Sequence, residues 1–205
     1  HPASYGSPRI ETLLGEPVIL VPLADGLGGH SFADGRELWH FPWANGAQVN
    51  AAQPVVVADD SLVFGCGYGV GTVRLDFKRS GETWTVTQQW HTSRFFPKFN
   101  DYVQLGDHIY GLSDGTLTCI EVATGKTKWK SGRYGYGQLL LVDETLLILS
   151  ESGRVVLVPA TPTRPDELSS FQALNSDDIT WNHPVLVRGK LLVRNGIEAA
   201  CYEID

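Results

Sequence analysis

The chain has 205 residues, with 16 Lys and Arg against 23 Asp and Glu, so its net charge at pH 7 is −7. Hydrophobic residues make up 42% of it, and 22 Gly and 11 Pro indicate many turns, which excludes a coiled coil, a collagen-like chain and a disordered acidic tail. The acidic balance predicts no nucleic-acid partner, and no apolar stretch approaches the length of a membrane span.

The sequence repeats itself along most of its length. Residues 27–39 align without a gap on residues 117–129, with Leu, Ala, Gly and Trp at matching positions. Aromatic residues that close the units, Trp39, Trp90, Trp129 and Phe171, are 51, 39 and 42 residues apart. Such spacings are close to the roughly 40–45 residues of a four-stranded propeller blade. We therefore predict an all-β propeller of four-stranded antiparallel blades, with about five blades at 7–45, 52–90, 99–132, 135–174 and 180–205.

Each unit consists of short β-rich runs separated by turn pairs. The first turns are predicted at Asp59-Asp60, Gly106-Asp107, Asp143-Glu144 and Arg188-Gly189. The second turns are predicted at Asp25-Gly26, Asp114-Gly115, Ser152-Gly153 and Asn195-Gly196, and the third at Asp34-Gly35, Ser80-Gly81 and Thr124-Gly125. Continuous apolar runs such as Leu139–Leu141 suggest strands buried on both faces. Almost no helix is expected, with Asp166–Ala173 as the best exception.

The fifth unit ends after its third strand, and no spare strand remains to close a ring. Because an open stack leaves unpaired strand edges, we expect a single propeller domain that is part of a larger one of seven or eight blades, or one that self-associates at its open edges. The absence of Met and of a signal-peptide pattern in residues 1–30 likewise leads us to expect further chain upstream.

The third unit contains Cys119-x-Glu121-x-x-Thr124-Gly125-x-x-x-Trp129. This stretch resembles the tryptophan-docking motif, Ala-x-Asp-x-x-Thr-Gly-x-x-x-Trp, of the PQQ-like (quinoprotein alcohol dehydrogenase-like) propeller repeats. That family includes quinoprotein dehydrogenases and the propeller lipoprotein of the outer-membrane β-barrel assembly machinery. The resemblance implies that Trp129, and likewise Trp39 and Trp90, pack against the neighbouring blade. A Trp suits such a seam because it buries a large area while its N–H still finds an acceptor.

The dehydrogenases of that family bind PQQ with calcium and often carry two adjacent cysteines. Here no two of the three cysteines are adjacent, and no catalytic Asp or calcium ligand matches a position of this chain. We therefore expect no cofactor, no metal and no catalytic residue. PQQ with calcium is expected only if the alternative, part of a PQQ-dependent dehydrogenase of alcohols or sugars, holds.

Other candidate sites have simpler interpretations. Cys66, Cys119 and Cys201 are expected to be small buried residues without a disulfide. The Gly65–Gly71 stretch fits a turn better than a phosphate site, because it lacks the G-x-G-x-x-G spacing and a following helix. The six histidines include no pair at zinc-ligand spacing. Carboxylate pairs such as Asp177-Asp178 are explained by turn chemistry, which leaves a propeller glycosidase as a third, weaker hypothesis.

Two connections are candidates for binding a partner at the rim of the propeller. The first joins the second and third units at 91–100, and the second joins the third and fourth at 132–137. Aromatic and Arg side chains are enriched where partners bind. The candidate residues are Arg94, Phe95, Phe96, Lys98, Arg133, Tyr134 and Tyr136.

These observations favour a noncatalytic propeller module that acts as a scaffold for a protein or polymer partner. A function as an enzyme is not favoured, and the quinoprotein dehydrogenase remains the alternative. The resemblance alone implies a periplasmic or secreted location.

Overall fold

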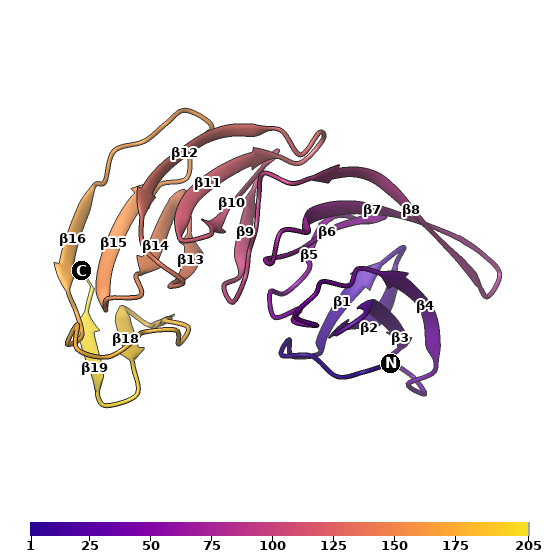
Figure 1. The fold of residues 1–205 in the computed structure, drawn as a ribbon, viewed down its shortest axis with the longest axis horizontal. Helices are drawn as coiled ribbons and strands as arrows, with labels where there is room; N and C mark the ends of the chain where they lie inside the picture. Colours follow the sequence, from indigo (N-terminus) through magenta and orange to yellow (C-terminus); the bar gives the residue numbers. More distant parts are fainter. Residues whose placement is uncertain (205) are drawn as a thin grey trace. The chain divides into compact units, whose positions relative to one another are not determined.

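The computed structural model describes residues 1–204, and these form five antiparallel sheets without a helix (Figure 1). The first sheet consists of β1 (Arg9–Leu13), β2 (Glu16–Leu23), β3 (Gly26–Ser31) and β4 (Glu37–Pro42). The second consists of β5 (Val55–Ala58), β6 (Ser61–Cys66), β7 (Gly71–Ser80) and β8 (Thr83–Thr92). The third consists of β9 (Tyr102–Leu105), β10 (His108–Ser113), β11 (Thr116–Glu121) and β12 (Thr127–Arg133).

The fourth sheet consists of β13 (Gln138–Val142), β14 (Thr145–Leu149), β15 (Arg154–Pro159) and β16 (Ser169–Gln172). The fifth consists of β17 (Val185–Val187), β18 (Lys190–Arg194) and β19 (Ala199–Glu203). In every sheet each strand pairs with the next one in the chain. This up-and-down meander is the form of a propeller blade. The exception expected from the sequence, a helix over Asp166–Ala173, is wrong, because β16 pairs there with β15.

The tight turns are where the sequence predicts them, with small shifts. Asp114 and Gly115, at φ of 46° and 79°, form the two-residue connection between β10 and β11. Positive φ at both central residues is the geometry whose twist matches a β-hairpin. The connection between β1 and β2 uses Leu14 and Gly15 in the same way, and this pair is not among the turn pairs named from the sequence.

The chain forms two compact units, one of His1–Lys98 with Glu121–Lys126, and the other of Phe99–Ile120 with the chain from Thr127 onward. In the first unit the core lies between the first and second sheets. Its largest members include Leu20, Trp39, Phe64 and Phe77. In the second unit one core lies between the third and fourth sheets, and another lies between the fourth and fifth.

The fourth sheet therefore has both faces covered. Leu146 and Ile148 belong to one core of the second unit, whereas Leu147 and Leu149 belong to the other. Successive side chains of a strand point to opposite faces, so a continuous apolar run is what a strand between two neighbouring sheets requires.

Candidate functional site

Two tryptophans on fourth strands donate hydrogen bonds at equivalent places. The indole N–H of Trp90 donates to the carbonyl oxygen of Val122 at 2.9 Å, and that of Trp129 donates to the carbonyl of Thr161 at 2.9 Å. Both acceptors follow the third strand of the next sheet in the chain. Trp39, the corresponding residue on β4, is buried like Trp129, whereas Trp90 is half-buried; among the described residues the Trp39 N–H has no acceptor.

The Thr124-Gly125 turn is the surface on which Trp90 lies. The Thr124 hydroxyl donates to a carboxylate oxygen of Glu121 at 2.5 Å, and the amide of Gly125 donates to the carbonyl of Glu121 at 2.8 Å. Gly125 has a φ of 67°, and a Cβ atom there would lie 2.7 Å from Cε3 of Trp90. Four motif residues, Glu121, Thr124, Gly125 and Trp90, are thus brought together within the first unit.

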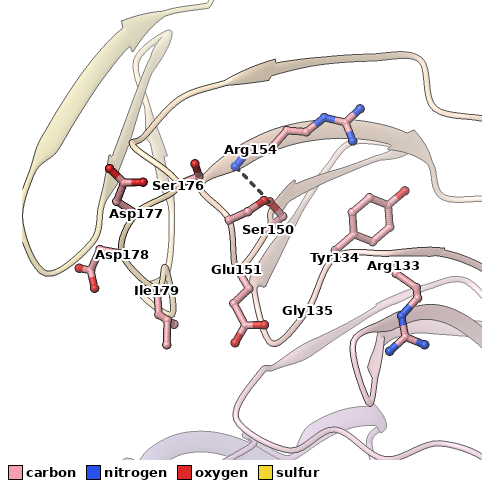
Figure 2. A pocket seen from close by; sticks show the side chains of 11 residues that line it. Arg133, Tyr134, Gly135, Ser150, Glu151, Arg154, Ser176, Asp177, Asp178 and Ile179 are labelled. Carbon is pink, nitrogen blue, oxygen red and sulfur yellow. Dashed lines mark hydrogen bonds between the residues drawn. The ribbon is translucent and has the colours of Figure 1, made fainter.

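A concavity with a volume of about 530 Å³ lies in the second unit (Figure 2). We call it the rim cleft. Three chain segments line it: the end of β12 with the connection that follows, the β14–β15 turn, and part of the β16–β17 connection. Its lining residues are Arg133, Tyr134, Gly135, Ser150, Glu151, Ser152, Arg154, Ser176, Asp177, Asp178 and Ile179.

Main-chain hydrogen bonds link these segments in series. The amide of Tyr134 donates to the carbonyl of Gly115 at 2.8 Å, and that of Glu151 donates to the carbonyl of Tyr134 at 2.8 Å. The amide of Thr180 then donates to the carbonyl of Glu151 at 2.9 Å. Buried and half-buried backbone groups are therefore paired across sheet boundaries, which fixes the walls of the cleft before any ligand arrives.

Most of the charged groups of the cleft are already held by neighbours. The carboxylate of Glu151 accepts from the Trp181 indole at 2.7 Å, and that of Asp178 accepts from the amide of Gly196 at 2.8 Å. Arg154 donates to Glu167 at 2.7 Å. Burial, with the hydrogen bond that Tyr134 donates to Glu167, raises the pKa of that phenol.

Two charged side chains of the cleft are left for a ligand. Within residues 1–204 the guanidinium of Arg133 and the carboxylate of Asp177 have no side-chain partner. Figure 2 shows Arg133 on one side of the cleft and Asp177 with Asp178 on the other. The cleft thus offers separated charges of opposite sign.

The residues expected to bind a partner at the rim are distributed over both units. Arg94 is exposed, while Phe96 and Lys98 are half-buried; the Lys98 ammonium lies 4.7 Å from the centre of the Tyr68 ring. Phe95 is fully buried, because its carbonyl accepts from the Thr72 hydroxyl at 2.8 Å and holds the segment against β7, so its ring is unavailable to a partner. These four residues belong to the first unit.

Three further candidates belong to the second unit. Arg133 is exposed in the rim cleft, but the ring of Tyr134 is 6% exposed and packs into the core between the third and fourth sheets. Tyr136 is half-buried, with its ring 5.8 Å from that of Phe99. Sequence reasoning missed Ser150, Glu151 and Ser176 as members of one site, since they lie on separate connections and no spacing rule relates them.

The cysteines are all free. Cys66 and Cys119 are buried as expected, and burial raises the pKa of each thiol to about 11. Cys201 is exposed, so the expectation of a buried residue was wrong there. It pairs with Leu192 on the outer face of the fifth sheet, whereas its neighbours Ala200 and Tyr202 face the core.

No family model and no curated protein sequence matches the chain. Solved structures do. BamB from Moraxella catarrhalis is 17% identical with a TM-score of 0.66, over 96% of this chain and 57% of that one. The computationally designed Ika8 protein is 12% identical with a TM-score of 0.62, over 91% and 55%. The Cps50 (Swd1) β-propeller domain of Myceliophteria thermophila is 13% identical with a TM-score of 0.62, over 91% and 66%.

These comparisons confirm the predicted all-β propeller fold with about five blades. The chain spans less than two thirds of the length of each of these structures. No helix long and apolar enough to cross a membrane occurs among the described residues.

Proposed function

We propose that this chain is a noncatalytic propeller module that binds a protein partner through the rim cleft. The observation that carries the proposal is the cleft itself, an open concavity of about 530 Å³ whose three walls are joined by main-chain hydrogen bonds. A preformed site loses little conformational entropy on binding, so its contacts contribute more fully to affinity.

The charges of the cleft favour a polypeptide ligand. Arg133 on one side suits a carboxylate, and Asp177 on the other suits a basic side chain. Such separated charges fix the register and direction of a bound segment through electrostatic complementarity. A loop of a partner that carries one acidic and one basic residue is the ligand that fits this arrangement.

The hydroxyl groups of the cleft support binding rather than covalent catalysis. Ser150 and Ser152 lie within 3.1 Å of each other at their hydroxyl oxygens, and Ser150 also accepts from the amide of Arg154 at 3.0 Å. A serine nucleophile needs an adjacent general base, and the lining residues include no His.

We also propose that the chain belongs to the PQQ-like repeats. The hydrogen bonds that the indoles of Trp90 and Trp129 donate to the next sheet support this.

A site-specific photocrosslinker tests the proposal. Placed at Ser176, which is exposed in the cleft, it should form one dominant crosslink to a partner in cells that express the protein. The matched control carries it at Asp107, which is exposed in a turn of the same unit but does not line the cleft. The double variant Arg133→Glu, Asp177→Lys should abolish the Ser176 crosslink. Equal crosslinking from both positions, or a Ser176 crosslink insensitive to the double variant, would contradict the proposal.

A further inference from the structure

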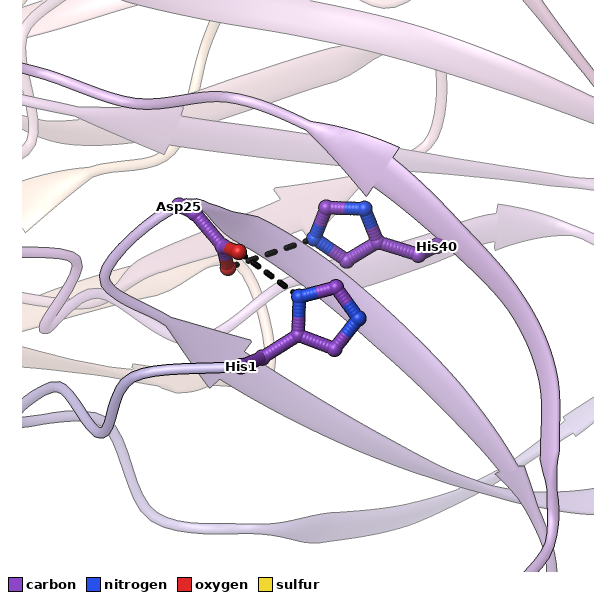
Figure 3. A group of neighbouring side chains, drawn as sticks. All are labelled: His1, Asp25 and His40. Atoms are coloured by element: carbon purple, nitrogen blue, oxygen red, sulfur yellow. Dashed lines mark hydrogen bonds and ion pairs between the residues drawn. The ribbon is translucent and has the colours of Figure 1, made fainter.

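Three side chains of the first unit converge at the β2–β3 turn (Figure 3). Nδ1 of His1 lies 2.6 Å from one carboxylate oxygen of Asp25, and Nε2 of His40 lies 3.3 Å from the other. The two imidazole rings stack, with centroids 4.0 Å apart and planes 17° apart. Both rings therefore direct a nitrogen to the same carboxylate, and all three ligand atoms lie within 4.8 Å of one another.

The backbone holds each of these residues in place. The amide of Ala24 donates to the carbonyl of Pro2 at 3.1 Å, and Ala3 forms an antiparallel bridge with Leu23, so the segment that carries His1 is fixed beside the turn. His40 lies on β4 opposite Gly28. A Cβ atom at Gly26 would lie 2.9 Å from Nε2 of His40, so the glycine leaves room for the ring.

A fourth residue orients His1. Its second ring nitrogen, Nε2, lies 3.1 Å from a carboxylate oxygen of Glu37. When Nδ1 of a histidine binds a metal, Nε2 carries the proton, and a carboxylate that accepts this proton fixes the tautomer and strengthens the ligand. The arrangement of Glu37, His1 and Asp25 has this form.

We propose that His1, Asp25 and His40 form a binding site for a zinc-class divalent metal ion, with Glu37 as the residue that positions His1. Zinc binds His nitrogen and carboxylate oxygen at about 2.0–2.2 Å, which places tetrahedral ligand atoms roughly 3.3 Å apart. The distance from His40 to one carboxylate oxygen of Asp25 already has this value, and the distance from His1 to the other oxygen needs to open by less than 1 Å. The exposed side of the cluster leaves the remaining position to water.

The charge of the cluster also favours a cation. With both imidazoles neutral, Asp25 and Glu37 give the four residues a charge of −2.

The spacing of histidines in the sequence predicted no metal site. His1 and His40 are 24 and 15 residues from Asp25, and only the fold of the first sheet brings the three together.

Calorimetric titration of the untagged full chain with Zn²⁺ at pH 7.5 tests the site. One equivalent should bind with a dissociation constant in the micromolar range, and His40→Gln and Asp25→Asn should each weaken binding at least tenfold. Glu37→Gln should weaken it by about 10-fold or more, as expected of a residue that orients a ligand. The matched control His108→Gln, a histidine of the second unit, should bind as tightly as the native chain.

A second readout separates coordination from loose association. Co²⁺ in place of Zn²⁺ should give visible absorption that the His40→Gln variant lacks. Circular dichroism verifies that each variant is folded.

Failure to bind Zn²⁺ up to 1 mM, or affinity unchanged by both His40→Gln and Asp25→Asn, would overturn the proposal. Neither result bears on the proposal that the rim cleft binds a partner, because the cleft consists of residues of the second unit.

Discussion

Trp39 and Trp129 occupy equivalent positions on fourth strands but differ in one hydrogen bond. Their side chains are 6% and 7% exposed. The Trp129 N–H donates to Thr161, while the buried Trp39 N–H has no acceptor among the described residues. A Phe at either place removes a similar apolar area, so the two substitutions isolate the hydrogen bond.

Trp129→Phe should lower the free energy of unfolding by about 1 kcal/mol more than Trp39→Phe does. In the first variant the half-buried Thr161 carbonyl loses its donor, and a hydrogen bond contributes about 0.5–1.5 kcal/mol net. In the second an unsatisfied N–H is removed together with the ring. Urea unfolding of both variants measures the difference, and equal losses would show that the Thr161 bond contributes nothing.

For single residues, the sequence predicts where a tryptophan lies in the repeat better than it predicts which group accepts its hydrogen bond. The recurring aromatic positions located the buried Trp39 and Trp129, because the period of a repeat is visible in one dimension, but Trp90 is half-buried and Phe171 is exposed. Whether an indole has an acceptor depends on a carbonyl 32 residues away and on the exact seating of the ring. The exposure of Cys201 likewise depended on which face of the fifth sheet is covered.

The turns between the third and fourth strands of the first and third sheets each contain a glycine, and the two glycines differ in how much space surrounds them. Gly35 and Gly125 both have positive φ, at 74° and 67°. Space around Gly35 is open, whereas Gly125 is covered by the Trp90 ring.

Gly125→Ala should therefore destabilise the protein more than Gly35→Ala does. Each substitution costs about 1 kcal/mol for an L-residue in the left-handed region. Gly125→Ala adds the cost of displacing Trp90, about 1–3 kcal/mol for an overpacked site. Thermal unfolding of the two variants checks this, and Trp fluorescence should change only in Gly125→Ala. Indistinguishable melting temperatures would mean that Trp90 does not rest on the turn.

Strand and turn signals predicted most hairpins of this chain, because Gly and Asp are needed wherever the backbone reverses tightly. The segment around β16 was the exception. All four of its residues are exposed, so they carry no apolar alternation that would reveal a strand. Its pairing comes from main-chain bonds to β15, which leave no mark on the sequence.

On the scale of the molecule, each core cluster is confined to one of the two compact units. In stacked repeats, stability is approximately a sum of local terms and nearest-neighbour terms. Damage to one core should therefore spread less to distant sheets than to adjacent ones.

Leu75→Ala, a core truncation that costs about 2–5 kcal/mol, should raise amide hydrogen exchange in β1–β8 while β13–β15 keep their native protection. Leu146→Ala, equally buried but in the second unit, serves as the reciprocal control and should give the opposite pattern. Exchange measured by mass spectrometry distinguishes the two patterns. A uniform rise across residues 1–204 in both variants would instead show one cooperative unit.

The indole bonds of Trp90 and Trp129 each span 32 residues, from a fourth strand to the end of the next third strand. A residue inserted within a paired strand of that interval would shift the register that brings the acceptor carbonyl to the indole. The stretch that follows the acceptor has no such constraint, and it is eight residues from Thr161 to Ser169 but five from Val122 to Thr127. In these two repeats, then, the interval that the indole bond spans has one length, and the stretch between the third and fourth strands absorbs the difference.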